Sequence, residues 1–572
     1  MSKIVEKNYS RWLNSSKVSN EDKEILKKMT PQEKDDAFFK VISFGTGGMR
    51  GILGPGTNRI NEHIIRRVSV GYGLFLLKRY KDAKERGVAI SHDNRHFSRE
   101  FTLETSKILN EMGINTFIFD SLRPTPELSY AVRYKHCIGG IMITASHNPK
   151  EHNGYKVYDE TGCQLVPEKI EPMLRIIKKL PNELDVEVPV TDVQGKQVIL
   201  EKDVDDTYVK LVEGIQINKD LNKDNFKIVY TPNHGTSYVN AMRVFKECGY
   251  DVYPVEKQCT PDPDFSGTLS PNPEDPRSFI EPIKLAQKVN ADLIVMTDPD
   301  GDRCGLACKE KDGTYTMLTG NESAAVLLDY ILSQKKEKGI LEKNGVMFNT
   351  VVTSEIGKEI ATSYGVKTEQ FLTGFKYIGD RLGYYDTHKG PVYEFGYEES
   401  YGCLPAPFVR DKDGIQAILL YSECALYYHL QGITMSQAYH LLGLRYGFHK
   451  NKLYNIYFKG SEGQKKMDEI MEQLMTKPFT AIGGVKVKIY ENYFKLERHN
   501  LKTKKITPIE GLPIGDLVKF YLADGTNICL RPSGTEPKFK IYIESICDDE
   551  TIANSKPDVF YKEISKLLGI ND

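Results

Sequence analysis

A chain of 572 residues is too long for one hydrophobic core, and at roughly 100 to 200 residues per domain it predicts about three to five domains. The hydrophobic fraction of 40% and the charged fraction of 27% exclude a fibrous or disordered chain, and no apolar run is long enough to span a bilayer. Its 77 basic and 78 acidic residues leave a net charge of −1, which excludes a general attraction for nucleic acid or anionic membrane. We therefore expect a multidomain enzyme without nucleic-acid or membrane partners, either a monomer or a homodimer.

The N-terminal segment and the cysteines both bear on location. The segment MSKIVEKNYSRWLNSSKV is polar and lacks an apolar stretch before a cleavage site, so we expect a cytoplasmic protein. The ten cysteines are scattered, and the closest pair, Cys304 and Cys308, lies in an apolar stretch. Buried reduced thiols are therefore expected rather than a zinc site or a disulfide framework.

An apolar strand, a loop, an amphipathic helix that ends in glycine and a second strand recur three times. The helices end at Gly113, Gly249 and Gly365, which are 136 and 116 residues apart, so each copy has the size of a domain. The alternation of strand and helix predicts mainly parallel or mixed sheets with helices on both faces. After about residue 450 the pattern changes to strands, with a hairpin turn expected at Asp524 and Gly525, and a final helix.

These patterns predict four domains, each with a loop of its own. We place an α/β domain with a serine loop at 1–210, and an α/β domain with an acidic loop at 211–325. A third α/β domain with a glutamate loop follows at 326–450, and a smaller α+β domain with a basic loop at 451–572.

The most informative segment is GGIMITASHNPKEHNGYKVY, residues 139–158, in which an apolar strand leads into a polar loop. The loop carries Ser146 and His147, and we expect this serine to be exposed and movable. A serine in such a loop is by itself most often a turn or helix-cap residue. Lys156 could return to the same place as a proton acceptor or donor, although a lone lysine near tyrosines is usually a solvated surface group.

The second segment is ADLIVMTDPDGDR, residues 291–303, where an apolar strand ends in three alternating aspartates. Side chains two apart in an extended loop point the same way, so Asp298, Asp300 and Asp302 can converge on one cation. An all-oxygen site suits a hard cation, and Mg²⁺ fits best because a phosphate oxygen can complete its octahedron. The alternative is a solvated acidic turn. Arg303 could hold phosphate or balance charge.

The remaining motifs are weaker when each is taken alone. GYEESYG, residues 396–402, offers Glu398 and Ser400 for sugar hydroxyls, but a plain loop with exposed glutamates is about equally plausible. RPSGTEPK, residues 531–538, combines cations, hydroxyls and a flexible backbone that can surround a phosphate, and its alternative is an ordinary turn. Four further segments supply cations or glycines near strand ends: FGTGGMRG with Arg50, SHDNRHFS with Arg95, LTGFK with Lys376, and VRDKDG with Arg410 and Lys412.

The segments TASHNP, DPDGD, GYEES and RPSGT occur in the order of the four loops of the α-D-phosphohexomutase family, and the chain resembles that family over essentially its whole length. The resemblance implies an α/β fold of four domains around a central cleft, three of them mixed-sheet α/β domains and the last a smaller α+β domain. It also implies an isomerase of carbohydrate metabolism that moves a phosphate between two hydroxyls of a hexose through a phosphoserine. One Mg²⁺ and a glucose 1,6-bisphosphate intermediate complete that expectation.

The resemblance also assigns roles to residues. It implies that Ser146 is the phosphoserine, assisted by Lys156, Arg50 and His147, and that Ser146, Asp298, Asp300 and Asp302 hold the metal. The implied substrate-binding residues are Arg303, Thr373, Gly374, Lys376, Glu398, Ser400, Arg410, Lys412, Arg531, Ser533, Gly534, Thr535 and Lys538.

Several functions stay open at this point. The chain is most similar to the long bacterial phosphoglucomutase and phosphopentomutase branch, and bifunctional phosphomannomutases carry a histidine where this chain has Gly402. Glucose phosphate is therefore the expected substrate, with pentose or mannose phosphate as alternatives. A metal-dependent phosphatase leaves TASHNP and RPSGT without a role, and a noncatalytic sugar-phosphate sensor does not need Ser146 and all three aspartates.

Overall fold

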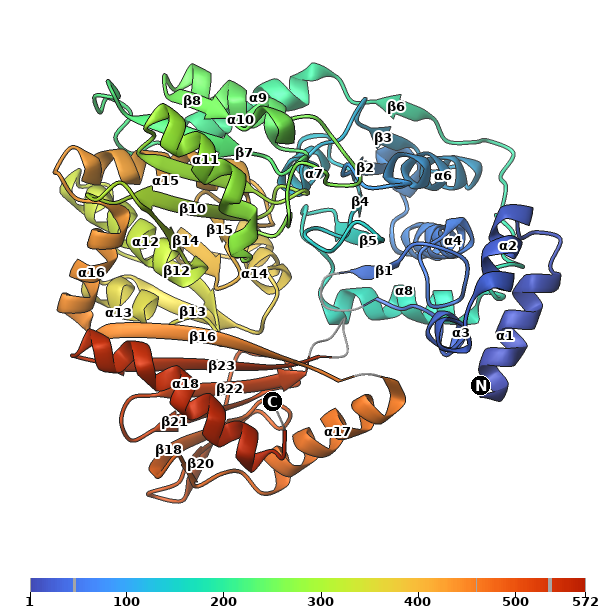
Figure 1. Cartoon of the computed structure of the whole chain (residues 1–572). Helices are drawn as coiled ribbons and strands as arrows, with labels where there is room; N and C mark the ends of the chain where they lie inside the picture. The colour runs from blue at the N-terminus through green and yellow to red at the C-terminus, as the bar shows by residue number, and fades with distance from the viewer. Residues whose placement is uncertain (1, 45–47, 459, 533–537, 571–572) are drawn as a thin grey trace. The chain divides into compact units, whose positions relative to one another are not determined.

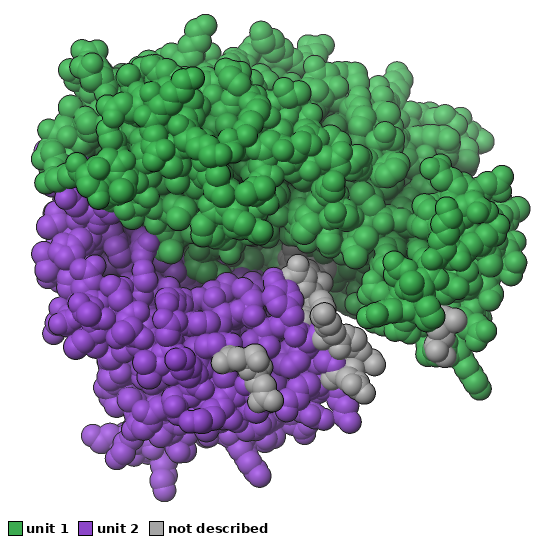
Figure 2. All heavy atoms as spheres, in the orientation of Figure 1, with its two compact units in different colours: residues 1–320, 374–432 green, residues 321–373, 433–572 purple. Residues whose placement is uncertain are grey.

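The computed structural model describes residues 2–44, 48–458, 460–532 and 538–570. The chain divides into two compact units (Figures 1 and 2). Unit 1 comprises Met1–Gly320 and Gly374–Gly432, and unit 2 comprises Asn321–Thr373 and Ile433–Asp572.

Unit 1 begins with three short helices, α1 (Lys3–Asn14), α2 (Asn20–Lys28) and α3 (Pro31–Phe38). Each starts at a serine or threonine whose side chain accepts a hydrogen bond from the first turn. They enclose a small core around Trp12, whose indole Nε1 donates to Glu183 Oε1 at 2.7 Å. The chain's one tryptophan therefore fastens the N-terminal helices to the segment that follows α8.

The first α/β sheet has the strand order β1-β5-β4-β2-β3-β6. Its strands are β1 (Met49–Ile52), β2 (Val88–His92), β3 (Thr116–Ile118), β4 (Gly139–Ile143), β5 (His152–Asp159) and β6 (Gln197–Ile199). The accompanying helices are α4 (Glu62–Arg79), α5 (Ala83–Arg86), α6 (Ser98–Glu111), α7 (Thr125–Tyr134), α8 (Pro167–Lys179) and α9 (Lys202–Glu213). Helices α4 and α6 lie on one face of the sheet and α7 on the other (Figure 1). The central strands β2 and β4 are buried along their whole length, as expected for a sheet covered on both faces.

The second sheet of unit 1 has the order β11-β10-β9-β7-β8. Its strands are β7 (Lys227–Thr231), β8 (Asp251–Pro254), β9 (Leu293–Thr297), β10 (Cys304–Lys309) and β11 (Tyr315–Leu318). Its helices are α10 (Tyr238–Glu247), α11 (Ile280–Val289) and the short 3₁₀ turns η1 (Glu256–Gln258) and η2 (Pro276–Phe279). Strand β9 is wholly buried and leads directly into the acidic loop.

The third α/β segment contributes to both units. Unit 1 contains α14 (Lys376–Thr387), the antiparallel pair β14 (Val392–Glu398) and β15 (Gly402–Leu404), and α15 (Gly414–His429). Unit 2 contains the parallel pair β12 (Gly345–Thr350) and β13 (Lys367–Phe371), with α13 (Ile356–Ser363) and α16 (Met435–Tyr446). Helix α12 (Gly320–Glu337) begins at the boundary residue Gly320.

The rest of unit 2 is an antiparallel sheet of order β16-β23-β22-β21-β18-β19-β20, with β17 paired to β18. Its strands are β16 (Phe448–Tyr457), β17 (Ala481–Ile482), β18 (Val485–Asn492), β19 (Glu497–Asn500), β20 (Lys505–Pro508), β21 (Val518–Leu522), β22 (Asn527–Pro532) and β23 (Lys538–Cys547). Helices α17 (Gly460–Thr476) and α18 (Glu550–Leu567) pack their apolar side chains on this sheet. The predicted hairpin turn lies between β21 and β22, where Gly525 has φ 87°.

The threefold repeat predicted from the sequence is confirmed. In each copy two parallel strands flank one helix: β2, α6 and β3, then β7, α10 and β8, then β12, α13 and β13. Gly113, Gly249 and Gly365 follow these helices with φ of 84°, 77° and 75°, the left-handed conformation that favours glycine. The predicted class of three mixed α/β domains and one α+β domain is therefore correct, and the boundaries near 210, 325 and 450 stay a prediction.

All ten cysteines lie in the described part of the chain and form no disulfide there, and all but Cys248 and Cys547 are buried, which agrees with reduced interior thiols. Within the described part of the chain, no helix combines the length and apolar character needed to cross a membrane.

One buried ion pair makes the stability of unit 2 depend on pH. His449 Nδ1 on β16 lies 2.9 Å from Glu544 Oε1 on β23, and His449 Nε2 lies 3.6 Å from Glu359 Oε2 on α13. Burial opposes charge on His449, but the two carboxylates raise its pKa to about 9. Burial likewise opposes charge on Glu544, but His449, Ser354 and Lys519 lower its pKa to about 2. Both groups are therefore charged near neutral pH.

We expect this pair to stabilise unit 2 most between about pH 4.5 and 6.5. The contribution of His449 is complete below its unfolded pKa near 6.5 and is lost as pH rises through about 9. The contribution of Glu544 is complete above about 4.5 and is lost as pH falls through about 2. His449→Gln should lower the free energy of unfolding by roughly 2 kcal/mol at pH 6 and by much less at pH 10, measured by urea denaturation. An equal loss at both pH values would contradict the charged pair.

Candidate active site

The serine loop connects β4 to β5 in unit 1. Ser146 Oγ donates a hydrogen bond of 2.8 Å to Asp298 Oδ2, and its backbone N donates to Thr144 Oγ1 at 2.7 Å. Ser146 has φ 54°, a left-handed conformation that is uncommon for a residue with a side chain. Its exposed fraction is only 1%, so the expectation of an exposed serine is wrong. The acidic loop of the second sheet packs on the serine, a contact between distant segments that the local sequence does not reveal.

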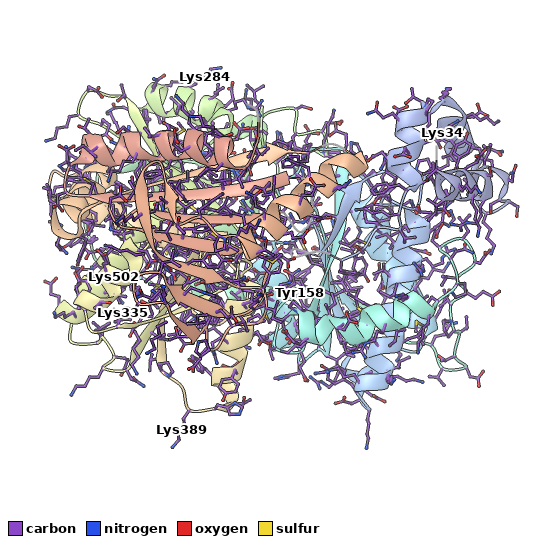
Figure 3. The ribbon with its side chains drawn as sticks, turned by 90° about the horizontal axis from the view of Figure 1, so that it is seen from below. Lys34, Tyr158, Lys284, Lys335, Lys389 and Lys502 are labelled. Atoms are coloured by element: carbon purple, nitrogen blue, oxygen red, sulfur yellow. The ribbon has the colours of Figure 1, made fainter. Side chains whose placement is uncertain are left out.

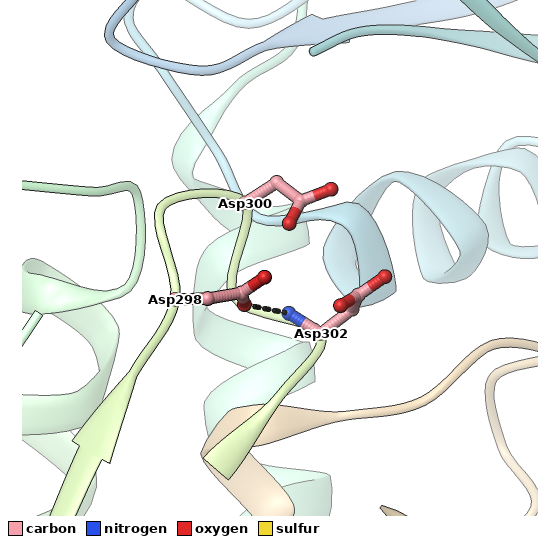
Figure 4. A group of neighbouring side chains, drawn as sticks. All are labelled: Asp298, Asp300 and Asp302. Carbon is pink, nitrogen blue, oxygen red and sulfur yellow. Dashed lines mark hydrogen bonds between the residues drawn. The ribbon is translucent and has the colours of Figure 1, made fainter. Parts of the chain in front are cut away.

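The three predicted aspartates converge in the loop between β9 and β10. Their carboxylate oxygens lie within 4.8 Å of one another, and Figure 4 shows all three side chains turned toward a common space. The backbone N atoms of Asp302 and Arg303 donate to Asp298 Oδ1 at 3.1 and 3.0 Å, which fixes the tight turn. Gly301 is required there, because it has φ 71° and an added Cβ would lie 2.4 Å from Ser237 Oγ.

The electrostatics of this loop match a cation site. Burial, followed by the charges of Asp300 and Asp302, raises the pKa of Asp298 far above its ordinary value. Burial opposes charge on Asp300 as well, but Lys156 lowers its pKa below the ordinary range. The Oδ1 atoms of Asp300 and Asp302 are buried and accept no hydrogen bond from any described residue. Three close carboxylates, two of them with an oxygen that accepts no hydrogen bond from a described residue, are the donor set of a hard cation such as Mg²⁺.

Lys156 extends from β5 toward the same carboxylates. Its Nζ donates to Asp300 Oδ2 at 2.8 Å and lies 3.4 Å from Asp302 Oδ2. Burial would lower the pKa of Lys156, but these two aspartates raise it above its ordinary value. The side chain is therefore held as an ammonium whose charge can balance that of a phosphoryl group, and its use as a proton acceptor or donor stays a prediction.

Tyr158, two residues after Lys156 on β5, contacts the residue that helps to place Lys412. Its hydroxyl donates to Asp411 Oδ2 at 3.0 Å. Tyr158 lies inside unit 1, whereas Lys284 and Lys389 of the same unit point outward from it (Figure 3). Asp411 in turn accepts a hydrogen bond from the backbone N of Lys412 at 2.9 Å, so it helps to place that lysine.

His147 and Arg50 lie beside the serine. His147 Nδ1 is 3.2 Å from Ser146 Oγ. Burial, with the charges of Arg303 and Arg50, lowers the pKa of His147 far below its ordinary value, so its imidazole is neutral. Arg50 is on β1 opposite Gly154, and its buried Nε has no hydrogen-bond partner among the described residues. That nitrogen is available to an anion in the site.

Glu398 and Lys412 connect the predicted sugar loop to the aspartates. Glu398 Oε1 accepts a hydrogen bond from the backbone N of Gly374 at 2.8 Å. Lys412 Nζ lies 3.6 Å from Glu398 Oε2 and 3.4 Å from Asp302 Oδ2. Ser400 lies in the turn between β14 and β15. The ammonium group of Lys412 therefore lies between the Glu398 carboxylate of the sugar loop and the Asp302 carboxylate of the acidic loop.

Lys376, Arg303 and Arg410 have environments that the sequence did not indicate. Lys376 begins α14, and burial lowers its pKa to about 8. Arg303 pairs with Glu274 at 2.5 Å. Arg410 pairs with both oxygens of Asp386, at 2.8 and 2.6 Å, so the structure does not turn its guanidinium toward the aspartates.

Three predicted residues of unit 2 are described, and three lie outside the described residues. Thr373 is the last residue of its segment of unit 2, and its buried Oγ1 has no hydrogen-bond partner among the described residues. Arg531 is on β22 and Lys538 begins β23, so the two bracket the predicted phosphate loop. Ser533, Gly534 and Thr535 belong to the part of this loop outside the described residues.

Two residues that hold the acidic loop were not predicted from the sequence. Thr125, at the start of α7, donates from its backbone N to Asp300 O at 2.8 Å and from Oγ1 to Asp300 Oδ2 at 3.1 Å. Its position between two prolines at a helix start was the signal that could have identified it. Glu274, the partner of Arg303, lies in an irregular loop and had no such signal.

The domain models of the phosphoglucomutase/phosphomannomutase family match the chain in four places. The α/β/α domains I, II and III match residues 41–183, 206–313 and 319–442, and the C-terminal domain matches residues 482–561. Together these matches cover most of the chain, including the serine, acidic, sugar and phosphate loops.

Individual proteins show the same similarity. The phosphoglucomutase of Staphylococcus aureus strain MRSA252 is 35% identical over 92% of this chain and 94% of its own. The phosphoglucomutase of Staphylococcus epidermidis strain RP62A is 34% identical over 94% of this chain and 97% of its own. Among solved structures, the open form of the phosphoglucomutase pp63/parafusin from Paramecium matches with a TM-score of 0.67 at 19% identity, covering 92% of this chain and 94% of that one. The chain therefore belongs to the phosphoglucomutase/phosphomannomutase family, the α-D-phosphohexomutases that its four motifs predicted.

Proposed function

We propose that this protein is a phosphoglucomutase that interconverts α-D-glucose 1-phosphate and glucose 6-phosphate through phosphorylated Ser146 and glucose 1,6-bisphosphate. The observation that carries the proposal is the 2.8 Å hydrogen bond from Ser146 Oγ to Asp298 Oδ2. It places a hydroxyl that can carry phosphate against three converging carboxylates. The two staphylococcal relatives bear the same enzyme name over nearly the full length of this chain.

Ser146 serves both half reactions in this mechanism. A sugar hydroxyl attacks the phosphorus of phospho-Ser146, the bond from phosphorus to the serine oxygen breaks, and the hydroxyl's proton replaces the one that Lys156 gives to the serine oxygen as the bisphosphate forms. After the bisphosphate has turned, Ser146 takes the other phosphoryl group and releases the product. Such transfer depends mainly on in-line placement and charge neutralisation, which the cations around Ser146 supply.

The residues around Ser146 fit one Mg²⁺. Asp298, Asp300 and Asp302, with an oxygen of the serine phosphate, would hold it, and when bound it neutralises charge on the transferring phosphoryl group. Lys156 would then supply a proton to the departing oxygen, and Arg50 a second positive charge. The distal phosphate would be held by Arg531, Lys538 and the loop between them.

Position 402 supports glucose rather than mannose phosphate. Gly402 occupies the place where bifunctional phosphomannomutases carry histidine, and an added Cβ there would lie 1.9 Å from Lys412 Cδ. A larger side chain there would require Lys412, which lies near Glu398 and Asp302, to move. A phosphopentomutase stays the second candidate, because a pentose phosphate offers the same phosphate group to these cations.

The proposal is tested by incubating the purified protein with Mg²⁺ and glucose 1-phosphate, mannose 1-phosphate or ribose 1-phosphate and following products by ³¹P NMR. We expect glucose 1-phosphate to have the highest kcat/KM of the three substrates and to give glucose 6-phosphate. We expect no net release of inorganic phosphate. Release of inorganic phosphate would instead identify a phosphatase. A protein inert with all three substrates and never phosphorylated on Ser146 would identify a sensor.

Lys156→Ala should lower kcat by roughly 10²- to 10⁴-fold, the range typical of a general acid or base. Phosphate on Ser146, detected by intact mass, should persist because the serine and the aspartates remain. Lys150→Ala is a matched control, since Lys150 lies in the serine loop just before β5 but forms an exposed ion pair with Asp264. Unchanged turnover in Lys156→Ala would remove the assigned role.

A further inference from the structure

Arg95 is a buried cation next to the serine loop that the proposed mechanism does not use. It lies between β2 and α6, and its exposed fraction is 3%. Its Nη2 donates to Ser146 O at 2.6 Å and to Asn148 O, and its Nη1 donates to Pro149 O at 2.7 Å and His152 O at 3.0 Å. One guanidinium therefore binds four carbonyl groups that span the loop from Ser146 to the start of β5.

Asp93 connects the same guanidinium to the other side of the loop. Its Oδ2 lies 3.2 Å from Arg95 Nε and accepts a hydrogen bond of 2.6 Å from Thr144 Oγ1. Thr144 Oγ1 in turn accepts the backbone N–H of Ser146 at 2.7 Å. The left-handed backbone of Ser146 is thus held on its N–H side through Asp93 and on its carbonyl side by Arg95. An uncommon backbone conformation persists only where neighbouring groups hold it in this way.

The outer face of Arg95 is covered by the segment between η1 and η2, which belongs to the second α/β sheet. The ring centroid of Phe265 lies 5.1 Å from Arg95 Cζ, and Phe265 is 5% exposed with φ 53°. Asn94 Nδ2 also donates to Asp262 O at 2.7 Å. These contacts lie within unit 1 and tie Arg95 to the segment between η1 and η2, which belongs to the same sheet domain as the three aspartates.

We propose that Arg95 is a positioning residue for the phosphoserine, which fixes the backbone of residues 146–152 so that Ser146 Oγ lies at Asp298. This inference rests on the proposed function, because it gives Arg95 a role only if Ser146 carries the phosphoryl group. Arg95 donates to carbonyl oxygens and does not touch the reacting atoms. Its planar fork of five N–H donors can satisfy four carbonyls at once, whereas a lysine has three donors on one nitrogen. Displacing a reacting group by about 1 Å can cost about 10²-fold in rate.

The test compares Arg95→Lys with Arg99→Lys. Arg99 is a matched control, because it is the second residue of α6, is half-buried and donates to Phe119 O at 3.1 Å, away from the serine loop. We expect Arg95→Lys to lower kcat for glucose 1-phosphate by about 10²-fold with KM nearly unchanged, and to slow phosphorylation of Ser146 by glucose 1,6-bisphosphate. We expect Arg99→Lys to leave both rates unchanged.

Hydrogen exchange gives a readout that does not depend on activity. Amides of residues 144–152 should exchange faster in Arg95→Lys than in the unsubstituted protein, whereas those of β9 and α4 should not change. Phe265→Leu keeps the segment apolar but removes the ring from the guanidinium, and it should produce the same pattern with a smaller loss of kcat, about 3- to 10-fold. If Arg95→Lys fails to fold, Phe265→Leu tests the positioning role of Arg95 instead.

Three results would overturn the positioning role. The first is an unchanged kcat with unchanged exchange in Arg95→Lys and Phe265→Leu. The second is a rise in KM with unchanged kcat, which would make Arg95 a substrate-binding residue. The third is faster exchange throughout unit 1, which would make it a general structural residue. If the unsubstituted protein had no mutase activity, the proposed function would fail, and exchange of residues 144–152 would still decide whether Arg95 fixes the loop.

Discussion

Ser146→Ala is expected to abolish interconversion of glucose 1-phosphate and glucose 6-phosphate, with a loss of kcat on the order of 10⁶-fold, the scale of removing a nucleophile. The reason is that the Ser146 hydroxyl both gives and receives the phosphoryl group. Its Oγ lies 2.8 Å from Asp298 Oδ2. Coupled measurement of glucose 6-phosphate, together with intact mass after incubation with glucose 1,6-bisphosphate, tests this directly.

Binding and catalysis should separate in this variant. Because Ser146→Ala removes only one buried hydroxyl, we expect sugar-phosphate binding by calorimetry to survive. Ser121→Ala is a suitable control, since Ser121 is exposed and its Oγ contacts Asp120 Oδ1. Ser146→Ala protein that kept substantial turnover, or that still gained one phosphoryl group, would refute the assignment of the phosphoserine.

Asp298→Asn is expected to lower the affinity for Mg²⁺ by at least about 10²-fold, because replacing even a residue behind the metal ligands costs about 10- to 100-fold. Asp298 is an acceptor on both oxygens, from Ser146 Oγ and from the backbone N atoms of Asp302 and Arg303. An amide in its place must turn its NH₂ group toward one of these donors, so the variant also disturbs the turn that gathers the carboxylates.

Titration calorimetry with Mg²⁺ and the Mg²⁺ dependence of kcat both report this change. Asp312→Asn is the matched control: Asp312 lies in the exposed turn between β10 and β11, where its Oδ1 accepts from Thr314. If Asp298→Asn bound Mg²⁺ as tightly as the unsubstituted protein, the acidic loop would not be the metal site.

The two most important groups were predicted because their signals are local. Asp298, Asp300 and Asp302 follow an apolar strand at alternating positions, and Ser146 follows another apolar strand in a loop interrupted by proline. Side chains at strand ends emerge at the edge of an α/β sheet, which is where such folds build their sites. The threefold repeat was readable for a similar reason, because a glycine after each helix reports a left-handed backbone at one position.

Other expectations depended on partners far away in the chain. Ser146 was expected to be exposed, but Asp298, which lies 152 residues further along the chain, covers it. Lys156 was given as a proton acceptor or donor, and its ion pairs with Asp300 and Asp302, which raise its pKa, are not indicated by the sequence around it. Carboxylates from the second α/β domain determine the exposure of Ser146 and the pKa of Lys156. The residues next to Ser146 and Lys156 in the sequence do not indicate these contacts.

The sequence by itself determined which residue types are candidates for the site: a serine and three aspartates in loops that follow apolar strands, a sugar-loop glutamate and several cations. Only the tertiary structure decided the pairings, such as Lys412 between Asp302 and Glu398, and Arg410 with Asp386 rather than with the aspartates. The physical reason is the distance along the chain over which each property is determined. The hydrophobic pattern and the local backbone conformation depend on neighbours within a few residues, whereas the electrostatic role of a charged side chain is set by whichever opposite charges packing brings within about 4 Å.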